Sequence, residues 1–176
     1  MHFPEDILQQ VFSGKILKQL NDSKKLTEKK REFLFDEIRE VASPGIFQMV
    51  SNKHIDANGI NHSIYYAIQK LVIKSGKKNL FLLIDGNYNF SSYPDSSAIQ
   101  YKSIIQGDSR VISIAAASIL AKVGRDRFMQ KISGKFPGFD FDKHKGYGTK
   151  NHLQAIASLG YTRMHRKSYK IQLPQL

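Results

Sequence analysis

The chain has 176 residues, of which 41% are hydrophobic and 24% charged, as is typical of a globular protein and not of a disordered or collagenous one. It carries 27 Lys and Arg against 15 Asp and Glu, a net charge of +12, and contains no cysteine. The length predicts a single domain over residues 1–176. The lack of cysteine excludes disulfides, thiolate metal sites and cysteine nucleophiles, whereas the charge favours a polyanionic partner.

No apolar run reaches the roughly 18 residues that cross a membrane, and the sequence opens without a secretion signal, so we expect a cytoplasmic protein. The basic residues gather in the last third, where twelve of them face three acidic residues between Lys122 and Lys170. A solubilising surface would explain this charge too, but aromatic residues that can stack on bases or sugars lie among the basic ones. These aromatic residues are Phe136, Phe139, Phe141, Tyr147, Tyr161 and Tyr169. Nucleic acid is therefore the expected partner, and no strongly amphipathic basic helix favours a membrane surface.

The first predicted element is a helix that Thr27 can cap and that runs to about Ala42, stopped by Pro44-Gly45. The run Ile46–Val50 predicts a strand. Apolar residues then recur at the helical period between Ile60 and Leu71, and this second helix is expected to end at Gly76.

The apolar run Leu80–Ile84 predicts a fully buried strand that stops at Asp85. A loop rich in Ser and Asn leads to a second strand over Ala98–Ile105, and Gly107-Asp108 is expected to turn the chain. A long helix follows over about Val111–Lys131, whose run of three alanines would let it approach a sheet closely.

A basic, glycine-containing loop is predicted over Lys135–Thr149, and Thr149 can cap a last short helix that ends at Gly160. The alternation of helices and strands along the chain predicts an α/β fold.

Asp85 is the first candidate site residue, because it directly follows the buried strand. The carboxyl end of a strand is where α/β proteins commonly place ligand sites. The alternative is a plain turn, since Asp-Gly is a common hairpin signal.

Asp126 is the second candidate, because it shares the apolar face of the long helix with Ile119 and Val123. A buried carboxylate needs a partner, which is either a neighbouring arginine or a cation shared with another carboxylate. Oxygen ligands are those that Mg²⁺ and Mn²⁺ prefer, so Asp85 and Asp126 together favour the second option.

The histidines in the basic region, His144, His152 and His165, are expected to contact phosphate or solvent and not a metal. Tyr147 lies between two glycines and is expected to be displayed at the surface, with a buried core tyrosine as the alternative.

Five motifs occur in one order along the chain. They are Asn21–Leu26, Ile84–Asn87, Ile114–Arg127, His144–Lys150 and His165–Tyr169. Together they resemble the motif set of bacterial type 2 ribonuclease H, also called ribonuclease HII, over roughly residues 20–169.

The resemblance implies a ribonuclease H-like fold, a mixed sheet flanked by helices with a helical C-terminal part. It implies an endonuclease that cleaves the RNA strand of RNA–DNA hybrids and cuts at ribonucleotides embedded in duplex DNA. The expected ends are 5′-phosphate and 3′-hydroxyl, the expected cofactor is Mn²⁺ or Mg²⁺, and the expected state is a monomer.

The family's site has four carboxylates, of which Asp85 resembles the third and Asp126 the fourth, so both are expected to be catalytic metal ligands. Lys24 in the first motif is expected to contact a phosphate. The expected nucleic-acid contacts in the basic motifs near the C-terminus are Lys145, Tyr147, Lys150 and Arg166.

The sequence departs from the family at its start. The family opens with a strand carrying Gly-x-Asp-Glu-Ala-Gly-Arg-Gly, which holds the first two carboxylates, and that motif does not occur here. We therefore expect a chain that lacks the first strand and has little activity. The alternative is a non-catalytic nucleic-acid-binding remnant of the same family.

Overall fold

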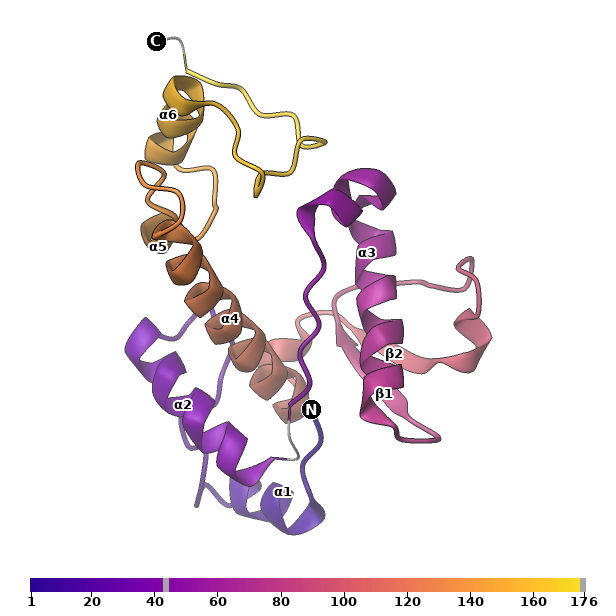
Figure 1. Cartoon of the computed structure of the whole chain (residues 1–176). Coiled ribbons are helices and arrows are strands. Elements are labelled where there is room, and N and C mark those ends of the chain that lie inside the picture. The colour runs from indigo at the N-terminus through magenta and orange to yellow at the C-terminus, as the bar shows by residue number, and fades with distance from the viewer. Residues whose placement is uncertain (43–44, 175–176) are drawn as a thin grey trace. The chain divides into compact units, whose positions relative to one another are not determined.

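The computed structural model describes residues 1–42 and 45–174, so Pro44, the expected stop of the first helix, lies outside the described residues. The described residues combine several helices with a small parallel sheet, which confirms the α/β class (Figure 1). In chain order the elements are α1 (Glu5–Phe12), α2 (Glu28–Val41), α3 (Asn52–Ser75), β1 (Phe81–Asp85), η1 (Ser96–Ala98), β2 (Gln100–Ile104), η2 (Gly107–Ser109), α4 (Ile112–Ser133), α5 (Phe141–His144) and α6 (Lys150–Leu159).

The chain divides into two compact units. The first unit takes in residues 1–48 and 65–123, and the second takes in residues 49–64 and 124–176. Helices α3 and α4 each contribute residues to both units.

Helix α2 forms as predicted and builds the core of the first unit. The Thr27 hydroxyl accepts a hydrogen bond from the Lys30 N–H at 3.3 Å, which satisfies one of the free donors of the first turn. Leu34 and Ile38, one helical turn apart, are almost completely buried. Burial of each such side chain contributes about 1.5–3 kcal/mol, so this stripe holds α2 in place.

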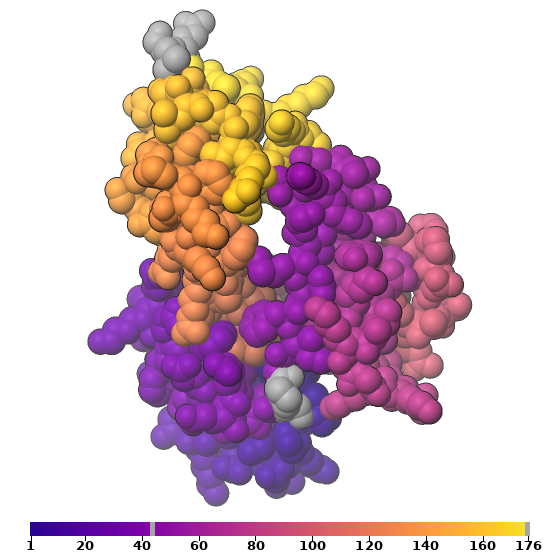
Figure 2. All heavy atoms as spheres, viewed as in Figure 1, coloured from indigo at the N-terminus to yellow at the C-terminus, as the bar shows by residue number. Residues whose placement is uncertain are grey.

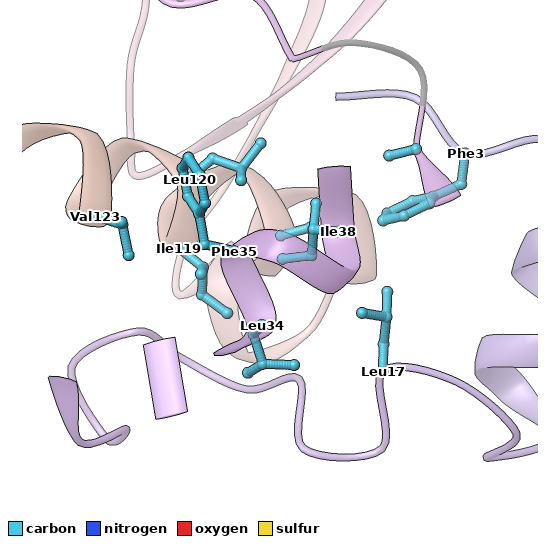
Figure 3. Packing of buried hydrophobic residues seen from close by; sticks show 10 residues of the cluster. Phe3, Leu17, Leu34, Phe35, Ile38, Ile119, Leu120 and Val123 are labelled. Atoms are coloured by element: carbon cyan, nitrogen blue, oxygen red, sulfur yellow. The ribbon is translucent and has the colours of Figure 1, made fainter. Parts of the chain in front are cut away.

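The partners of α2 come from the N-terminal segment and from α4, as Figure 3 shows. Ala116, Ile119 and Val123 of α4 lie in one cluster with the buried residues of α2. The prediction that the alanine run faces a sheet is therefore wrong for Ala116. Its small side chain lets α4 pack closely in the helical cluster, in which no buried member comes from β1 or β2.

Strands β1 and β2 pair in parallel, from Phe81 opposite Gln100 to Asp85 opposite Ile104. They are the two strands in the described part of the chain. The prediction that the first strand is fully buried is wrong, because Phe81 is 60% exposed and Leu83 is 40% exposed. Their side chains alternate with less exposed ones, so one face of β1 is covered and the other is open.

Three further expectations change in detail. Residues 46–50 form no strand, because they pair with no other segment in the described structure. Helix α3 begins earlier than predicted and is interrupted at Gly59, whose φ of +77° is not helical. Ile60 is 44% exposed, and Tyr65 is the buried hydrophobic residue of this helix instead. The predicted loop 135–149 contains the short helix α5.

The second unit has its own apolar cluster. Ile132, Phe139, Phe141 and Ile156 are buried in it. Helix α6 forms as predicted, with the Thr149 hydroxyl accepting from the His152 N–H at 3.3 Å and Gly160 following its last residue. In Figure 2 the C-terminal residues, in yellow, lie against the purple start of α3, where the Asn52 amide donates to the His165 carbonyl at 2.8 Å.

Candidate active site

Asp85 is the last residue of β1, at the carboxyl end of the parallel pair. Its Oδ1 accepts a hydrogen bond from the Gly107 N–H at 2.8 Å, which ties the end of β1 to the turn that follows β2. Because the strands are parallel, the alternative of a hairpin at Asp85-Gly86 is wrong. The carboxylate therefore lies where parallel sheets commonly present ligand groups.

Asp108 is a carboxylate close enough to Asp85 for the two charges to interact, and the sequence did not predict it. It lies in η2, directly after Gly107, and is 7% exposed. Burial raises the pKa of the Asp108 carboxyl most, and the charges of Asp85 and Asp22 and a hydrogen bond with Asp22 raise it further. The positive charge of Lys24 lowers the pKa of Asp108. Three carboxylates and one lysine thus share a single electrostatic environment.

The sequence signal for Asp108 depends on how the two predicted strands pair. Asp108 follows a predicted strand in the same way that Asp85 does, and the carboxyl ends of parallel strands meet at one edge of a sheet. By itself, the Gly107-Asp108 pair predicts only a turn.

Asp126 is buried on α4, with 3% of its surface exposed, as its place on the apolar face predicts. It belongs to the second unit, whereas Asp85, Asp108 and Lys24 belong to the first. Its function as a metal ligand stays a prediction.

The expected nucleic-acid contacts differ in exposure. Tyr147 is 63% exposed, so it is displayed as expected, and the Arg125 guanidinium lies 5.6 Å from the centre of its ring. Lys145 is 9% exposed, which makes it the least exposed of the predicted contacts. Lys150 is exposed in the first turn of α6, and Arg166 is exposed with its guanidinium 3.9 Å from the ring centre of Tyr169.

Two expectations about the basic region are wrong. His144, His152 and His165 are 9%, 5% and 8% exposed, so they are buried groups and not solvated phosphate contacts. Phe139 and Phe141 are buried in the apolar cluster of the second unit and cannot stack on bases.

The described residues contain no group of three His, Cys, Asp or Glu side chains placed to hold one metal ion. In the same part of the chain, no helix has the length and apolar character needed to cross a membrane.

Comparison with known proteins agrees with the resemblance. The family model for ribonuclease HII matches residues 13–172. A ribonuclease HII from Caldicellulosiruptor saccharolyticus is 44% identical over 154 residues, which cover 88% of this chain and 73% of the relative. A ribonuclease HII from Aliarcobacter butzleri is 43% identical over 153 residues, covering 87% and 76%.

A solved structure supports the fold independently. The chain resembles a chain in the structure of the PCNA:RNase HII complex from Archaeoglobus fulgidus with a TM-score of 0.71 and 22% sequence identity. The match covers 98% of this chain and 86% of that one. The ribonuclease H-like fold expected from the motifs is thereby confirmed. The family model and the curated relatives together identify the chain as a member of the ribonuclease HII family and, by family, as a ribonuclease H, a hydrolytic nuclease.

Proposed function

We propose that the chain cleaves the RNA strand of RNA–DNA hybrids and cuts at ribonucleotides embedded in duplex DNA, leaving 5′-phosphate and 3′-hydroxyl ends. The site is proposed to use a divalent cation, and the reaction to take place in the cytoplasm. The observation that carries the proposal is the pair Asp85 and Asp108 beside the ends of two parallel strands.

The donor set fits a hard cation. Asp85 uses Oδ1 to accept from Gly107. Burial and the neighbouring negative charges raise the pKa of Asp108, so a cation between the two carboxylates would relieve their repulsion. We propose Mn²⁺ or Mg²⁺, held by Asp85 and Asp108, with Asp22 near enough to act on Asp108 electrostatically. Such an ion would stabilise negative charge that develops on the phosphodiester.

Asp126 remains the alternative metal ligand, as the motif resemblance predicts. The two candidates differ in what supports them. Asp108 is supported by its charge interaction with Asp85 within one unit, and Asp126 is supported by its motif and its burial. Substitution of each carboxylate separately distinguishes them.

The basic residues are proposed to bind the nucleic acid. Lys24 is exposed and close enough to Asp108 to lower its pKa, so a phosphate held by Lys24 would lie beside the proposed metal ligands. Tyr147, Lys150 and Arg166 supply an exposed ring and two exposed cations in the second unit. The partly hidden Lys145 is the weakest member of the predicted set.

The test is Mn²⁺-dependent cleavage of a labelled DNA duplex that contains one ribonucleotide, with Asp85→Asn, Asp108→Asn and Asp126→Asn compared with the 176-residue chain. Asp36→Asn is the control, because Asp36 is an exposed carboxylate of α2 outside the site. We expect slow cleavage by the unsubstituted chain and the control, in keeping with the little activity that the sequence predicts, and no detectable cleavage by the Asp85 and Asp108 variants. Full activity of Asp108→Asn with loss in Asp126→Asn would assign the second ligand to Asp126.

A different outcome would favour the non-catalytic alternative. Binding of the duplex with no cleavage at any Mn²⁺ concentration would contradict the proposed reaction and leave a nucleic-acid-binding protein. Phosphate contacts make binding fall steeply with salt, so the salt dependence of affinity measures the basic surface in either case.

A further inference from the structure

Two buried histidine side chains of the second unit form a hydrogen-bonded chain that runs from the backbone of Thr162 to the backbone of Tyr147. The Thr162 N–H donates to Nδ1 of His165 at 2.9 Å. Nε2 of His165 lies 3.0 Å from Nε2 of His152. Nδ1 of His152 lies 2.9 Å from the Tyr147 carbonyl oxygen. Residues about fifteen positions apart along the sequence are thus joined through side chains.

The partners assign one proton to each ring. His165 accepts at Nδ1, so a neutral His165 carries its proton on Nε2 and donates it to His152. His152 accepts at Nε2, so its proton is on Nδ1 and is donated to the Tyr147 carbonyl. Every ring nitrogen of this pair has a partner in this arrangement. The rings have no nitrogen left for a metal or for a proton from water.

His144 supports the same arrangement from the other side. Its Nδ1 accepts from the Gly146 N–H at 3.1 Å, so its Nε2 donates to the Phe139 carbonyl at 2.6 Å. Its ring stacks on that of His152, with the centres 4.2 Å apart and the planes 13° apart. The backbone of the loop 145–148 is therefore hydrogen-bonded to the rings of His144 and His152.

Tyr147 is held through its backbone while its ring stays exposed. Its N–H donates to the His144 carbonyl at 2.9 Å. Its carbonyl accepts from the Thr149 N–H at 2.8 Å and from His152. A tyrosine that is 63% exposed, on a backbone with three hydrogen bonds, is suited to contact another molecule, because little conformational entropy is lost on binding.

We propose that His165 and His152 are positioning residues, which fix the Tyr147 ring in the orientation that contacts the sugar of a bound nucleic acid. This inference rests on the proposed function, in which Tyr147 contacts the substrate. The histidines themselves touch no substrate, and they act only through the Tyr147 carbonyl.

The surroundings keep the rings neutral. Burial is the main cause that lowers the pKa of both His152 and His165, and charge on the neighbouring histidines lowers it further. The groups around the pair are the His144 ring, the edge of the Tyr161 ring 5.5 Å from His165, and the apolar rings of Phe139 and Phe141. An added proton would occupy a nitrogen that now accepts a hydrogen bond, so it would break the chain at that link.

The first measurement is a long-range ¹H–¹⁵N correlation spectrum of the whole labelled chain at pH 7.5. We expect the Nε2–H tautomer for His144 and His165 and the Nδ1–H tautomer for His152. The opposite tautomer at His152 would overturn the proposal, because the Tyr147 carbonyl would then have no donor from that ring. This measurement does not depend on activity.

The second measurement is the affinity for a fluorescent DNA duplex with one ribonucleotide, in EDTA so that no cleavage occurs. We expect Tyr147→Ala and His152→Ala each to weaken binding by about tenfold, the scale of one stacking contact. The double variant should bind no more weakly than Tyr147→Ala alone, because His152 acts through Tyr147. Losses that multiply in the double variant would overturn the proposal.

His152→Asn separates positioning from loss of fold. The Asn amide can take the place of the Nδ1–H donor, so binding should stay within roughly threefold of that of the unsubstituted chain. His2→Ala is the matched control, since His2 is exposed and lies in the first unit. If Tyr147→Ala binds normally, the positioning role fails. If the unsubstituted chain does not bind the duplex, the proposed function fails, and the tautomers still report on the histidine chain.

Discussion

Gly107 gives a quantitative test of how tightly the candidate site is packed. Its N–H donates to Asp85, and a Cβ added at this position would lie 2.6 Å from Cδ1 of Ile114 and 3.4 Å from Oδ1 of Asp85. An ordinary contact begins near 3.4 Å, so Ile114, a buried residue, must move its end by about 0.8 Å. Overpacking of this kind costs about 1–3 kcal/mol, and we expect Gly107→Ala to lower the free energy of unfolding by that amount.

The side chain of Ile114 offers a direct rescue. Ile114→Val removes the Cδ1 atom with which the new Cβ collides, and alone it should cost about 0.5–1.5 kcal/mol. Combined with Gly107→Ala it should remove most of the clash, so the double variant should be about 1 kcal/mol more stable than the two single effects predict when added. Gly148→Ala is the control, because a Cβ there meets no atom within 4 Å.

The assay is urea unfolding of Gly107→Ala, Ile114→Val, the double variant and Gly148→Ala. Mn²⁺-dependent cleavage is measured on the same variants. Gly107→Ala should lose activity as well as stability, because a shift of the turn displaces both Asp85 and Asp108. The double variant should recover part of both. Strict additivity of the two unfolding energies would refute the reasoning, as would a Gly107→Ala variant as stable as Gly148→Ala.

Three further outcomes are expected from the described contacts. Burial and like charges raise the pKa of Asp108, so the ionised carboxylate lowers the free energy of unfolding as pH rises from the unfolded pKa of 3.8 through the folded pKa. Asp108→Asn should therefore raise the thermal midpoint at pH 7 while it abolishes cleavage. The pKa values of His152 and His165 are lowered, so stability should be complete above about pH 6.5 and fall below it, measured by urea midpoints at pH 7.5 and 5.5. Thr149→Ala should cost about 1 kcal/mol, whereas Thr149→Ser should restore the helix cap.

Much of the fold was predictable because its signals are local. The caps Thr27 and Thr149 and the terminating Gly160 mark helix ends through hydrogen bonds to their own neighbours, and these predictions are confirmed. The strand predicted over residues 46–50 failed because a strand exists only where another strand pairs with it. The predicted burial of the first strand failed for a related reason. An apolar run does not say whether one face or both will be covered.

The candidate site also has one residue that the sequence predicts and one that it does not. Asp85 follows from the sequence because one strand and its end can be identified from a continuous apolar run. Asp108 becomes visible only when β2 is placed parallel to β1, since this pairing brings the two strand ends together. A Gly-Asp pair after an isolated strand has no feature that separates a ligand from a turn.

The histidines show how a local sequence pattern can suggest the wrong chemistry. In the sequence they lie among lysines and arginines, which suggested contact with phosphate. In the structure His152 and His165 are buried. Hydrogen bonds join them to the backbone of Tyr147, which is exposed. A basic region can therefore contain two functions in one stretch of sequence. In our proposal, the exposed cations bind a polyanion without regard to sequence, whereas the buried histidine rings fix the Tyr147 side chain that contacts the sugar.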